Sequence, residues 1–352
     1  MELWGLGDLT FATPVLREAT TQNEVHLVAK PYARELLHPS LPGVKFIRYD
    51  APWTRYLGKY KLWEWDWRKL FSLIFQLRKE KYDAAVSVRN DPRDHLFMWL
   101  IGARERYGFP LRGSGFFLTH PLARSRSKQH KVEDWIEIGK ALALPGIEEE
   151  QPRLRHPGYL SQNIEEVFAG IRKPVVCVHV GARIPVRRWP EAYFENIIRQ
   201  LRRHFDFHLI LVPDPDGYGL GLAPLADVCI SRLSVRELID LVGRADLLFC
   251  NDSGPSHIAA SCGRPVIPIF GPSDPGWFRP WGDIHKVVIR DICPWRPCKD
   301  YCLFSEAYCM TKLMPDSVWP EIHRHILWLI ERGIIPRTMM RDAPMPATGI
   351  RA

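Results

Sequence analysis

The feature of this sequence that most constrains the fold is a pair of short apolar runs that enclose a glycine turn and a stretch of small residues. The runs are Leu247–Cys250 and Pro265–Phe270, and runs of this length between turn residues are typical of buried strands. Between them lie the turn-forming residues Asn251–Ser256 and the helix-forming residues Ser256–Cys262, which Gly263 ends. A strand, a turn and a helix in this order place backbone N–H groups and the positive end of a helix dipole at the edge of a sheet. The sequence therefore predicts an α/β fold that holds a phosphate group at this turn.

The remainder of the chain alternates apolar runs with amphipathic segments. Strands are expected at residues 1–4, 25–29, 44–49, 84–88, 174–180 and 208–212. One helix is expected to begin at Thr13, and others to cover residues 67–81, 91–101, 190–204, 234–243 and 315–331. Strands and helices that alternate in this way form βαβ units with a mostly parallel sheet.

The length of the chain and a polar crossing near its middle predict two domains. A chain of 352 residues exceeds what one core usually organises. Pro145, Pro152, Pro157 and an acidic run predict an extended segment over residues 144–174. We therefore place an N-terminal domain at residues 1–145, a linker at 146–172, a C-terminal domain at 173–335 and a tail at 336–352, for which disorder is one outcome.

The net charge of +8 predicts attraction to an acidic partner, and charge alone allows nucleic acid, anionic lipid or a phosphorylated substrate. No fold signature of a nucleic-acid-binding protein occurs, so nucleic acid is not expected as a partner. The sequence has no run of about 18 apolar residues and no charged-then-apolar leader. Eight cysteines are too few for a disulfide scaffold. The expected location is the cytoplasm, with peripheral contact to a membrane left open.

Three groups of motifs occur in a characteristic order along the chain. They are Gly7-Asp8-Leu9, Arg187-Arg188-Trp189-Pro190, and Asp252-Ser253-Gly254 with His257 and Phe270-Gly271-Pro272-Ser273. A cation in the second group can neutralise a departing pyrophosphate. Together these motifs resemble glycosyltransferase family 9, the bacterial heptosyltransferases, over residues 1–330.

The resemblance implies the GT-B fold, in which two Rossmann-like domains face each other across a crevice, the N-terminal one binding the acceptor and the C-terminal one the donor. It implies inverting, metal-independent transfer of a heptose from ADP-heptose to a hydroxyl of the lipopolysaccharide inner core, without a cofactor. The partners are then an anionic glycolipid and, peripherally, the inner membrane surface. The alternatives are a GT-B transferase that uses another nucleotide sugar or an autotransporter protein acceptor, and a non-catalytic nucleotide-sugar-binding module.

The resemblance also assigns site residues. On the residues alone, Asp8 caps a helix or closes a turn at least as well as it serves as a general base, and the resemblance makes it the expected base. The expected donor-binding residues are Arg187, Arg188, Asp252, Ser253, Gly254 and His257. Arg188 is expected to hold the departing ADP, and His257 either bonds the nucleotide or braces the loop.

Two basic stretches leave alternatives open. Residues 101–131 carry seven basic residues and one acid, and they form either a solvated face or an acceptor site in which Arg124, Arg126 and Lys128 are the candidates. Residues 53–69 carry six aromatic and five basic residues, and they either pack as core or rest at a membrane interface.

Four cysteines, Cys293, Cys298, Cys302 and Cys309, lie within seventeen residues. Their spacing differs from that of common zinc knuckles, so free thiols or a disulfide are favoured over a metal. The resembled family often carries a cysteine-rich loop here, and a subset that modifies autotransporters holds iron through it. We assign no metal ligand.

Overall fold

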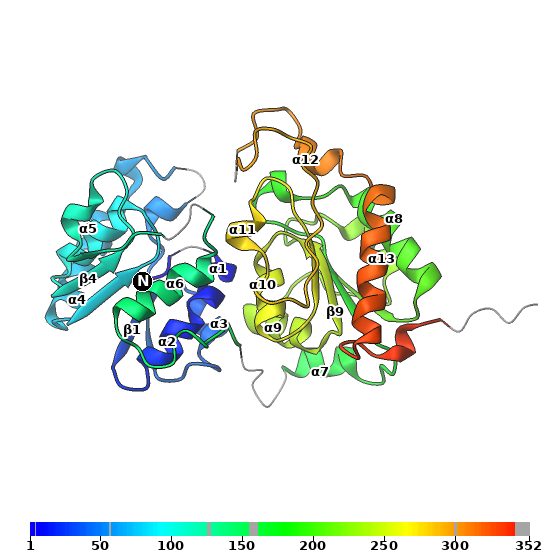
Figure 1. The fold of residues 1–352 in the computed structure, drawn as a ribbon, viewed down its shortest axis with the longest axis horizontal. Helices are drawn as coiled ribbons and strands as arrows, with labels where there is room; N and C mark the ends of the chain where they lie inside the picture. The colour runs from blue at the N-terminus through cyan, green and yellow to red at the C-terminus, as the bar shows by residue number, and fades with distance from the viewer. Residues whose placement is uncertain (4, 56–57, 125–127, 155–160, 299–300, 342–352) are drawn as a thin grey trace, which may run out of the picture. The chain divides into compact units, whose positions relative to one another are not determined.

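The computed structural model describes residues 1–341 except residues 4, 56–57, 125–127, 155–160 and 299–300 (Figure 1). Contacts between residues divide the chain into two units, which we call the N-terminal and C-terminal units. The first comprises residues 1–157 with 276–278, and the second residues 158–275 with 279–352. Each unit is described by itself.

The C-terminal unit contains a five-stranded parallel sheet. Its strands are β6 (Val175–His179), β7 (His208–Val212), β8 (Val228–Cys229), β9 (Leu247–Asn251) and β10 (Val266–Ile269). The strand order is β10-β9-β6-β7-β8, so the first strand of the unit lies between its second and its fourth. This is the Rossmann order, and the chain changes direction across the sheet between β6 and β9.

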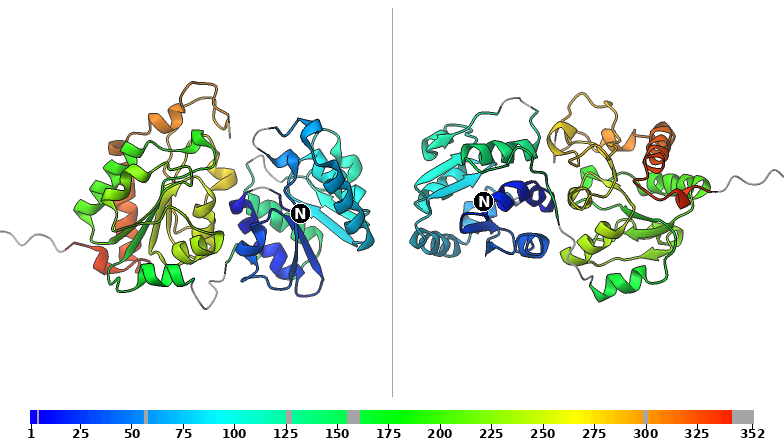
Figure 2. Two further views of the ribbon diagram at one scale, coloured as in Figure 1. Left: turned by 180° about the vertical axis from the view of Figure 1, so that it is seen from behind. Right: turned by 60° about the horizontal axis from the view of Figure 1, so that its bottom comes forward.

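Helices cover both faces of this sheet (Figures 1 and 2). The main ones are α7 (Gln162–Phe168), α8 (Glu191–His204), α9 (Val235–Arg244), α10 (Gly254–Ser261) and α13 (Pro315–Glu331). Phe194 of α8 and Ile322 of α13 share one buried cluster with Phe249 of β9, whereas α9 and α10 pack together on the other face. The short elements of this unit are η4 (Pro185–Arg187), η5 (Leu220–Leu225), α12 (Tyr308–Thr311) and η6 (Arg337–Met339). Helix α11 (Pro275–Phe278) begins at the last residue before the segment that is grouped with the N-terminal unit.

The N-terminal unit has two smaller parallel sheets. One pairs β1 (Val25–Ala29) with β2 (Val44–Arg48), and the other has the order β3 (Ala84–Ser87), β4 (Glu105–Gly108), β5 (His120–Pro121). The first residues of the chain join them, because Glu2 bridges Ala29 in parallel and the Met1 amine donates to the Val86 carbonyl at 2.8 Å. Of the strand expected at residues 1–4, Glu2 forms a single bridge. This segment lies between β1 and β3, which is where the first strand of a Rossmann sheet lies.

The helices of this unit also cover both faces (Figure 2). They are α1 (Leu6–Phe11), α2 (Thr13–Ala19), α3 (Ala33–Leu37), α4 (Trp67–Lys79), α5 (Pro92–Leu100) and α6 (Lys131–Ala141), with the 3-10 turns η1 (Pro52–Thr54), η2 (Leu62–Glu64) and η3 (Ser114–Phe117). Helices α1, α2 and α6 contact one another. Leu73 of α4 and Phe97 of α5 belong to a separate cluster that also contains Tyr49 and Trp53.

Two parts of the chain differ from the sequence prediction. Helix α7 forms within the stretch expected to be extended, and it contacts α9. The predicted tail is ordered at its start, because Met339 is fully buried and its carbonyl accepts from the Asp206 N–H at 2.8 Å. The rest of the tail, residues 342–352, lies outside the described residues. None of the helices in the described part is long and apolar enough to cross a membrane.

Candidate active site

The turn between β9 and α10 lies at the switch point of the C-terminal sheet. The Asp252 N–H donates to the Ile269 carbonyl at 2.9 Å, which ties the turn to β10. Ser253 is the N-cap residue of α10, but its hydroxyl donates to the Asn251 carbonyl at 3.2 Å and makes no cap bond to the helix. The N-terminus of α10 therefore presents backbone N–H groups and the positive end of its dipole at the point where open α/β sheets bind ligands.

Asn251 fixes this turn to the loop that follows β6, and sequence analysis gave it no role. Its side chain is fully buried. The amide oxygen accepts from the Trp189 N–H at 3.0 Å, and the amide nitrogen donates to the Val180 carbonyl at 2.6 Å. Because both ends of the amide are engaged, the two loops at the switch point hold one position. The sequence feature that could have indicated this role is that Asn251 is a polar residue directly after an expected buried strand.

The two arginines of the loop after β6 have different surroundings. Arg187 Nη1 lies 3.3 Å from Oδ2 of Asp252, which is only 2% exposed. The guanidinium of Arg187 therefore lies at the β9–α10 turn. Arg188 Nη2 lies 2.7 Å from Asp216 Oδ2 and 3.3 Å from Asp214 Oδ2. Its guanidinium also lies 5.0 Å from the centre of the Tyr218 ring. Arg187 is thus the arginine that the structure brings to the turn, whereas two carboxylates balance the charge of Arg188.

Hydrogen bonds lower the pKa of Asp216. The Tyr218 backbone N–H donates to its carboxylate at 3.0 Å, and Arg188 donates to it as well. Hydrogen bonds to the charged form favour that form, so the pKa of Asp216 lies below its usual value. Asp216 is therefore ionised at neutral pH and holds Arg188 in place.

Two histidines lie near the same edge of the sheet. His257 is on α10 and is 6% exposed, which fits the bracing role better than a nucleotide contact. His179 ends β6, and burial lowers its pKa to about 4 although Asp214 acts in the opposite direction. The His179 ring is therefore neutral at pH 7. Sequence analysis gave His179 no role.

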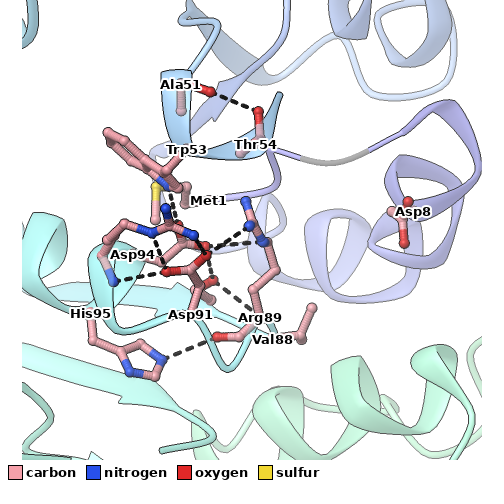
Figure 3. Close-up of polar contacts among 12 residues, drawn as sticks. Met1, Asp8, Ala51, Trp53, Thr54, Val88, Arg89, Asp91, Asp94 and His95 are labelled. Carbon is pink, nitrogen blue, oxygen red and sulfur yellow. Dashed lines mark hydrogen bonds and ion pairs between the residues drawn. The ribbon is translucent and has the colours of Figure 1, made fainter. Parts of the chain in front are cut away.

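Asp8 lies in the first turn of α1 in the N-terminal unit. Its Oδ2 accepts from the Gly5 N–H at 3.0 Å at the start of the helix. The carboxylate is half-buried. The structure thus shows the helix-capping contact that the residues alone allowed, and the role of Asp8 as the base stays a prediction. Figure 3 shows Asp8 to one side of a charged cluster that follows β3.

This charged cluster is centred on Asp94, which is fully buried. Trp53 Nε1 donates to Asp94 Oδ1 at 2.8 Å, the Ser87 hydroxyl donates to Oδ2 at 3.2 Å, and Arg89 Nε lies 3.4 Å from Oδ2 (Figure 3). Arg89 is itself 3% exposed and also contacts Asp91. Sequence analysis missed the cluster, although Arg89, Asp91 and Asp94 follow directly after an expected strand.

Burial and pairing move the pKa values in this cluster in opposite directions. Burial raises the pKa of Asp94, since Arg89 offsets only part of the desolvation. Burial acts on Asp91 in the same sense, but the hydrogen bonds from Arg93 prevail and lower the pKa of Asp91. His95 Nε2 contacts the Arg89 carbonyl at 3.1 Å and Nδ1 contacts the Ser114 hydroxyl at 2.9 Å. The loop after β3 is therefore fixed by matched charges.

The predicted acceptor residues are only partly described. Arg124 donates from Nε to Asp134 Oδ1 at 2.9 Å and from Nη2 to the Val88 carbonyl at 3.3 Å, and its guanidinium lies 4.5 Å from the centre of the Phe109 ring. These contacts join α6 to the loop after β3 and hold Arg124 in place. Arg126 lies outside the described residues, and Lys128 is exposed.

All eight cysteines are free thiols. Cys293 and Cys309 belong to the core of the C-terminal unit, and burial raises the pKa of Cys309 to about 11. Within the described ranges, which omit residues 299–300, no three or more His, Cys, Asp or Glu side chains are grouped to hold a metal ion.

Comparison with known proteins decides the family. The model of glycosyltransferase family 9 (heptosyltransferase) matches residues 70–306. The chain belongs to this family. It is therefore a glycosyltransferase, as the motifs predicted.

Individual relatives are distant. Lipopolysaccharide heptosyltransferase 3 of Escherichia coli is 25% identical over 245 residues, which cover 63% of this chain and 71% of the relative. Lipopolysaccharide core heptosyltransferase OpsX of Haemophilus influenzae is 20% identical over 305 residues, 82% of each chain. The solved ADP-heptose LPS heptosyltransferase II of E. coli has a TM-score of 0.66 at 19% identity and covers 93% of this chain and 98% of that one. The expected GT-B fold, with two Rossmann-like domains, is confirmed.

Proposed function

We propose that this family 9 glycosyltransferase moves a heptose from ADP-heptose to a hydroxyl of an anionic lipopolysaccharide core acceptor. The observation that supports this most is the β9–α10 turn, where a helix N-terminus and Arg187 meet at a Rossmann switch point. The relatives named above are lipopolysaccharide heptosyltransferases, and the solved neighbour is named for ADP-heptose. We assign donor binding to the C-terminal unit and acceptor binding to the N-terminal unit.

The donor half of the proposal concerns the diphosphate. Its oxygens would accept from the backbone N–H groups around Ser253 and Gly254, and Arg187 would supply the charge. Negative charge on the departing ADP grows in the transition state, so a fixed cation and a helix end stabilise that state more than the ground state. We give Arg187 this role ahead of Arg188, because Arg187 pairs with Asp252 at the turn itself, whereas Arg188 pairs with Asp214 and Asp216 in the loop after β7.

The acceptor half of the proposal concerns Asp8. A carboxylate has several acceptor sites, so the bond from the Gly5 N–H leaves Asp8 able to receive a proton. The acceptor oxygen would attack the anomeric carbon as its proton passes to Asp8, and ADP would leave with the electron pair of the broken bond. A single displacement of this kind inverts the anomeric carbon. Since cationic side chains and a helix end neutralise the leaving group, we propose that transfer needs no metal ion.

Transfer assays with purified enzyme test the proposal. The enzyme would be incubated with a deacylated core acceptor and with ADP-heptose, UDP-sugars or GDP-sugars in turn. Each reaction would be run with and without a chelator, and the masses of the products would be measured by mass spectrometry. We expect product only from ADP-heptose and no effect of the chelator. Product from another nucleotide sugar would overturn the donor assignment, and loss of product with the chelator would overturn the metal-independent mechanism. Mass analysis of the core from a deletion strain then shows which sugar is missing.

A further inference from the structure

One surface of the N-terminal unit carries exposed aromatic side chains that the proposed reaction does not use. It runs from residue 59 through η2 and along α4. Its exposed large apolar residues are Tyr60, Leu62, Trp63, Trp67, Phe71 and Phe75, and we call this surface the aromatic–basic face. Trp63 is 79% and Phe75 67% exposed. Contiguous apolar surface of this kind commonly marks an interaction site.

Helix α4 is apolar on two sides. Its buried side carries Leu70, Leu73, Ile74 and Leu77, which pack into the core of the unit. Trp67, Phe71 and Phe75 recur every four residues and so line up along another stripe of the same helix, exposed to solvent. The core of the unit explains why the buried side is apolar. Packing within the described part of the unit does not explain the exposed stripe of Trp67, Phe71 and Phe75.

The face is held in a fixed shape before it binds anything. Trp67 Nε1 donates to the Leu62 carbonyl at 2.9 Å, which ties α4 to η2. The Trp67 ring stacks on Phe71 at 6.0 Å and lies 5.2 Å from Trp65. Trp65 in turn lies 5.6 Å from the buried ring of Trp53. Because few side chains need to be ordered, binding to this face has a small entropy cost.

Basic residues surround the aromatic stripe. Residues 59–79 contain six lysines and arginines and two acids, so the face carries a net charge of +4. Arg68, Lys69, Arg78 and Lys79 are exposed along α4. A second copy of the chain would bring like charges together, which disfavours self-association through this face. An anionic surface with an apolar layer beneath it complements both features.

We propose that the aromatic–basic face docks this protein onto an anionic lipid bilayer. The aromatic rings would lie at the level of the headgroups, and the lysines and arginines would contact lipid phosphates. Docking would be peripheral and reversible. It does not depend on the sugar donor, so it can be tested without the transfer reaction. Within residues 53–69, Trp53 packs in the core, whereas the exposed residues of the face do not.

Vesicle binding with two kinds of variant tests this proposal. Full-length protein would be co-sedimented with vesicles of phosphatidylcholine alone and of phosphatidylcholine with phosphatidylglycerol. Trp63→Ser with Phe75→Ser removes two exposed rings, and Arg68→Glu with Lys69→Glu reverses two charges. The charge reversal falls in the first turn of α4, where glutamate favours the helix dipole, so folding is not weakened. Trp295→Ser, at a 62% exposed tryptophan of the C-terminal unit, is the matched control.

We expect binding to the anionic vesicles only, weakened by salt at about 0.5 M. Each double variant should lose at least about tenfold in affinity, while Trp295→Ser binds as wild type and all variants keep the wild-type melting temperature. Equal loss in Trp295→Ser, or binding unchanged in both double variants, would overturn the proposal. A dimer in light scattering that only the aromatic variant dissolves, without vesicle binding, would show that a second copy occupies the face. A failure of ADP-heptose transfer with vesicle binding intact would overturn the proposed function alone.

Discussion

The two switch points share a strand order and differ in how the helix after the strand is capped. In the C-terminal unit, α10 begins after β9, and Arg187 pairs with Asp252 in the turn between them. In the N-terminal unit, Arg89 and Arg93 pair with Asp91 and Asp94 in a cluster that is largely buried. The difference lies in the helix that follows each strand: the Asp91 side chain caps α5, whereas Ser253 makes no side-chain cap bond to α10, which suits the anion that we propose for that turn. Under the proposed function, one backbone frame serves two chemical tasks.

Asp8→Asn should have the largest effect on activity, because it removes the proposed base from the N-terminal site. Asparagine keeps an oxygen that accepts from the Gly5 N–H, so α1 should keep its cap. We expect kcat to fall at least about 100-fold, with ADP affinity unchanged in calorimetry. A variant that keeps more than about a tenth of the rate, a loss below about 1.4 kcal/mol, would place the base elsewhere.

Replacing Arg187 should have the next largest effect, and Arg188 provides its matched control. We expect Arg187→Ala to lower kcat about 100-fold, because a fixed charge next to the leaving group is lost. Arg187→Lys keeps the charge and should recover part of the rate. Arg188→Ala removes this cation from Asp214 and Asp216 and should lower stability only slightly, with a smaller effect on rate. Steady-state kinetics that rank the two alanine variants in the reverse order would return the role to Arg188.

Substitutions at Gly254 and Gly263, at the two ends of the α10 segment, should separate effects on ADP affinity from effects on stability. Gly254→Val adds a branched side chain where a phosphate would approach the backbone, so ADP affinity should fall at least about tenfold while the melting temperature changes little. Gly263 ends the α10 segment with φ +74°, a conformation that favours glycine. Gly263→Val should therefore lower stability by about 1 kcal/mol or more and leave ADP affinity intact. Unchanged ADP affinity in the Gly254 variant would move the nucleotide away from this turn.

Elements that depend on local pattern could be predicted from the sequence. Strand β7 and helix α13 have the expected bounds, because apolar runs and amphipathic spacing act within one segment. The capping box of Ser234 and Glu237 was also predictable, since its two partners are three residues apart.

Contacts between distant segments could not be predicted in this way. The Asp94 cluster brings Trp53 from η1 to Ser87 and Arg89 after β3, and no local pattern encodes that meeting. The choice between Arg187 and Arg188 depends on a 3-10 turn, η4, that directs adjacent side chains to different acids. Family motifs predicted the donor-binding residues of the β9–α10 turn, but only the fold shows which of them meet.

His179 and Asp91 should contribute to stability in different pH ranges. The folded-state pKa of His179 is lowered to about 4, below about 6.5 for an exposed histidine, so the unfolded chain binds more protons between these values. Stability from the neutral His179 ring is then present above about pH 6.5 and is lost toward pH 4, with a size on the order of 1 kcal/mol for a ring that water partly reaches. The lowered pKa of Asp91 acts later, because its contribution is present above about pH 4 and is lost below it.

Urea unfolding of the full chain at pH 7.5, 5.0 and 3.5 measures both contributions. His179→Gln should reduce the loss of stability between pH 7.5 and 5.0 and, because the ring titrates down to about pH 4, also part of the loss between pH 5.0 and 3.5. Asp91→Asn should reduce only the second loss, because its paired carboxylate is protonated only in that step. If His179→Gln retains the full wild-type loss above pH 5.0, the ring is not held neutral at the end of β6. His179 and Asp91 would then no longer differ in the pH range in which they contribute.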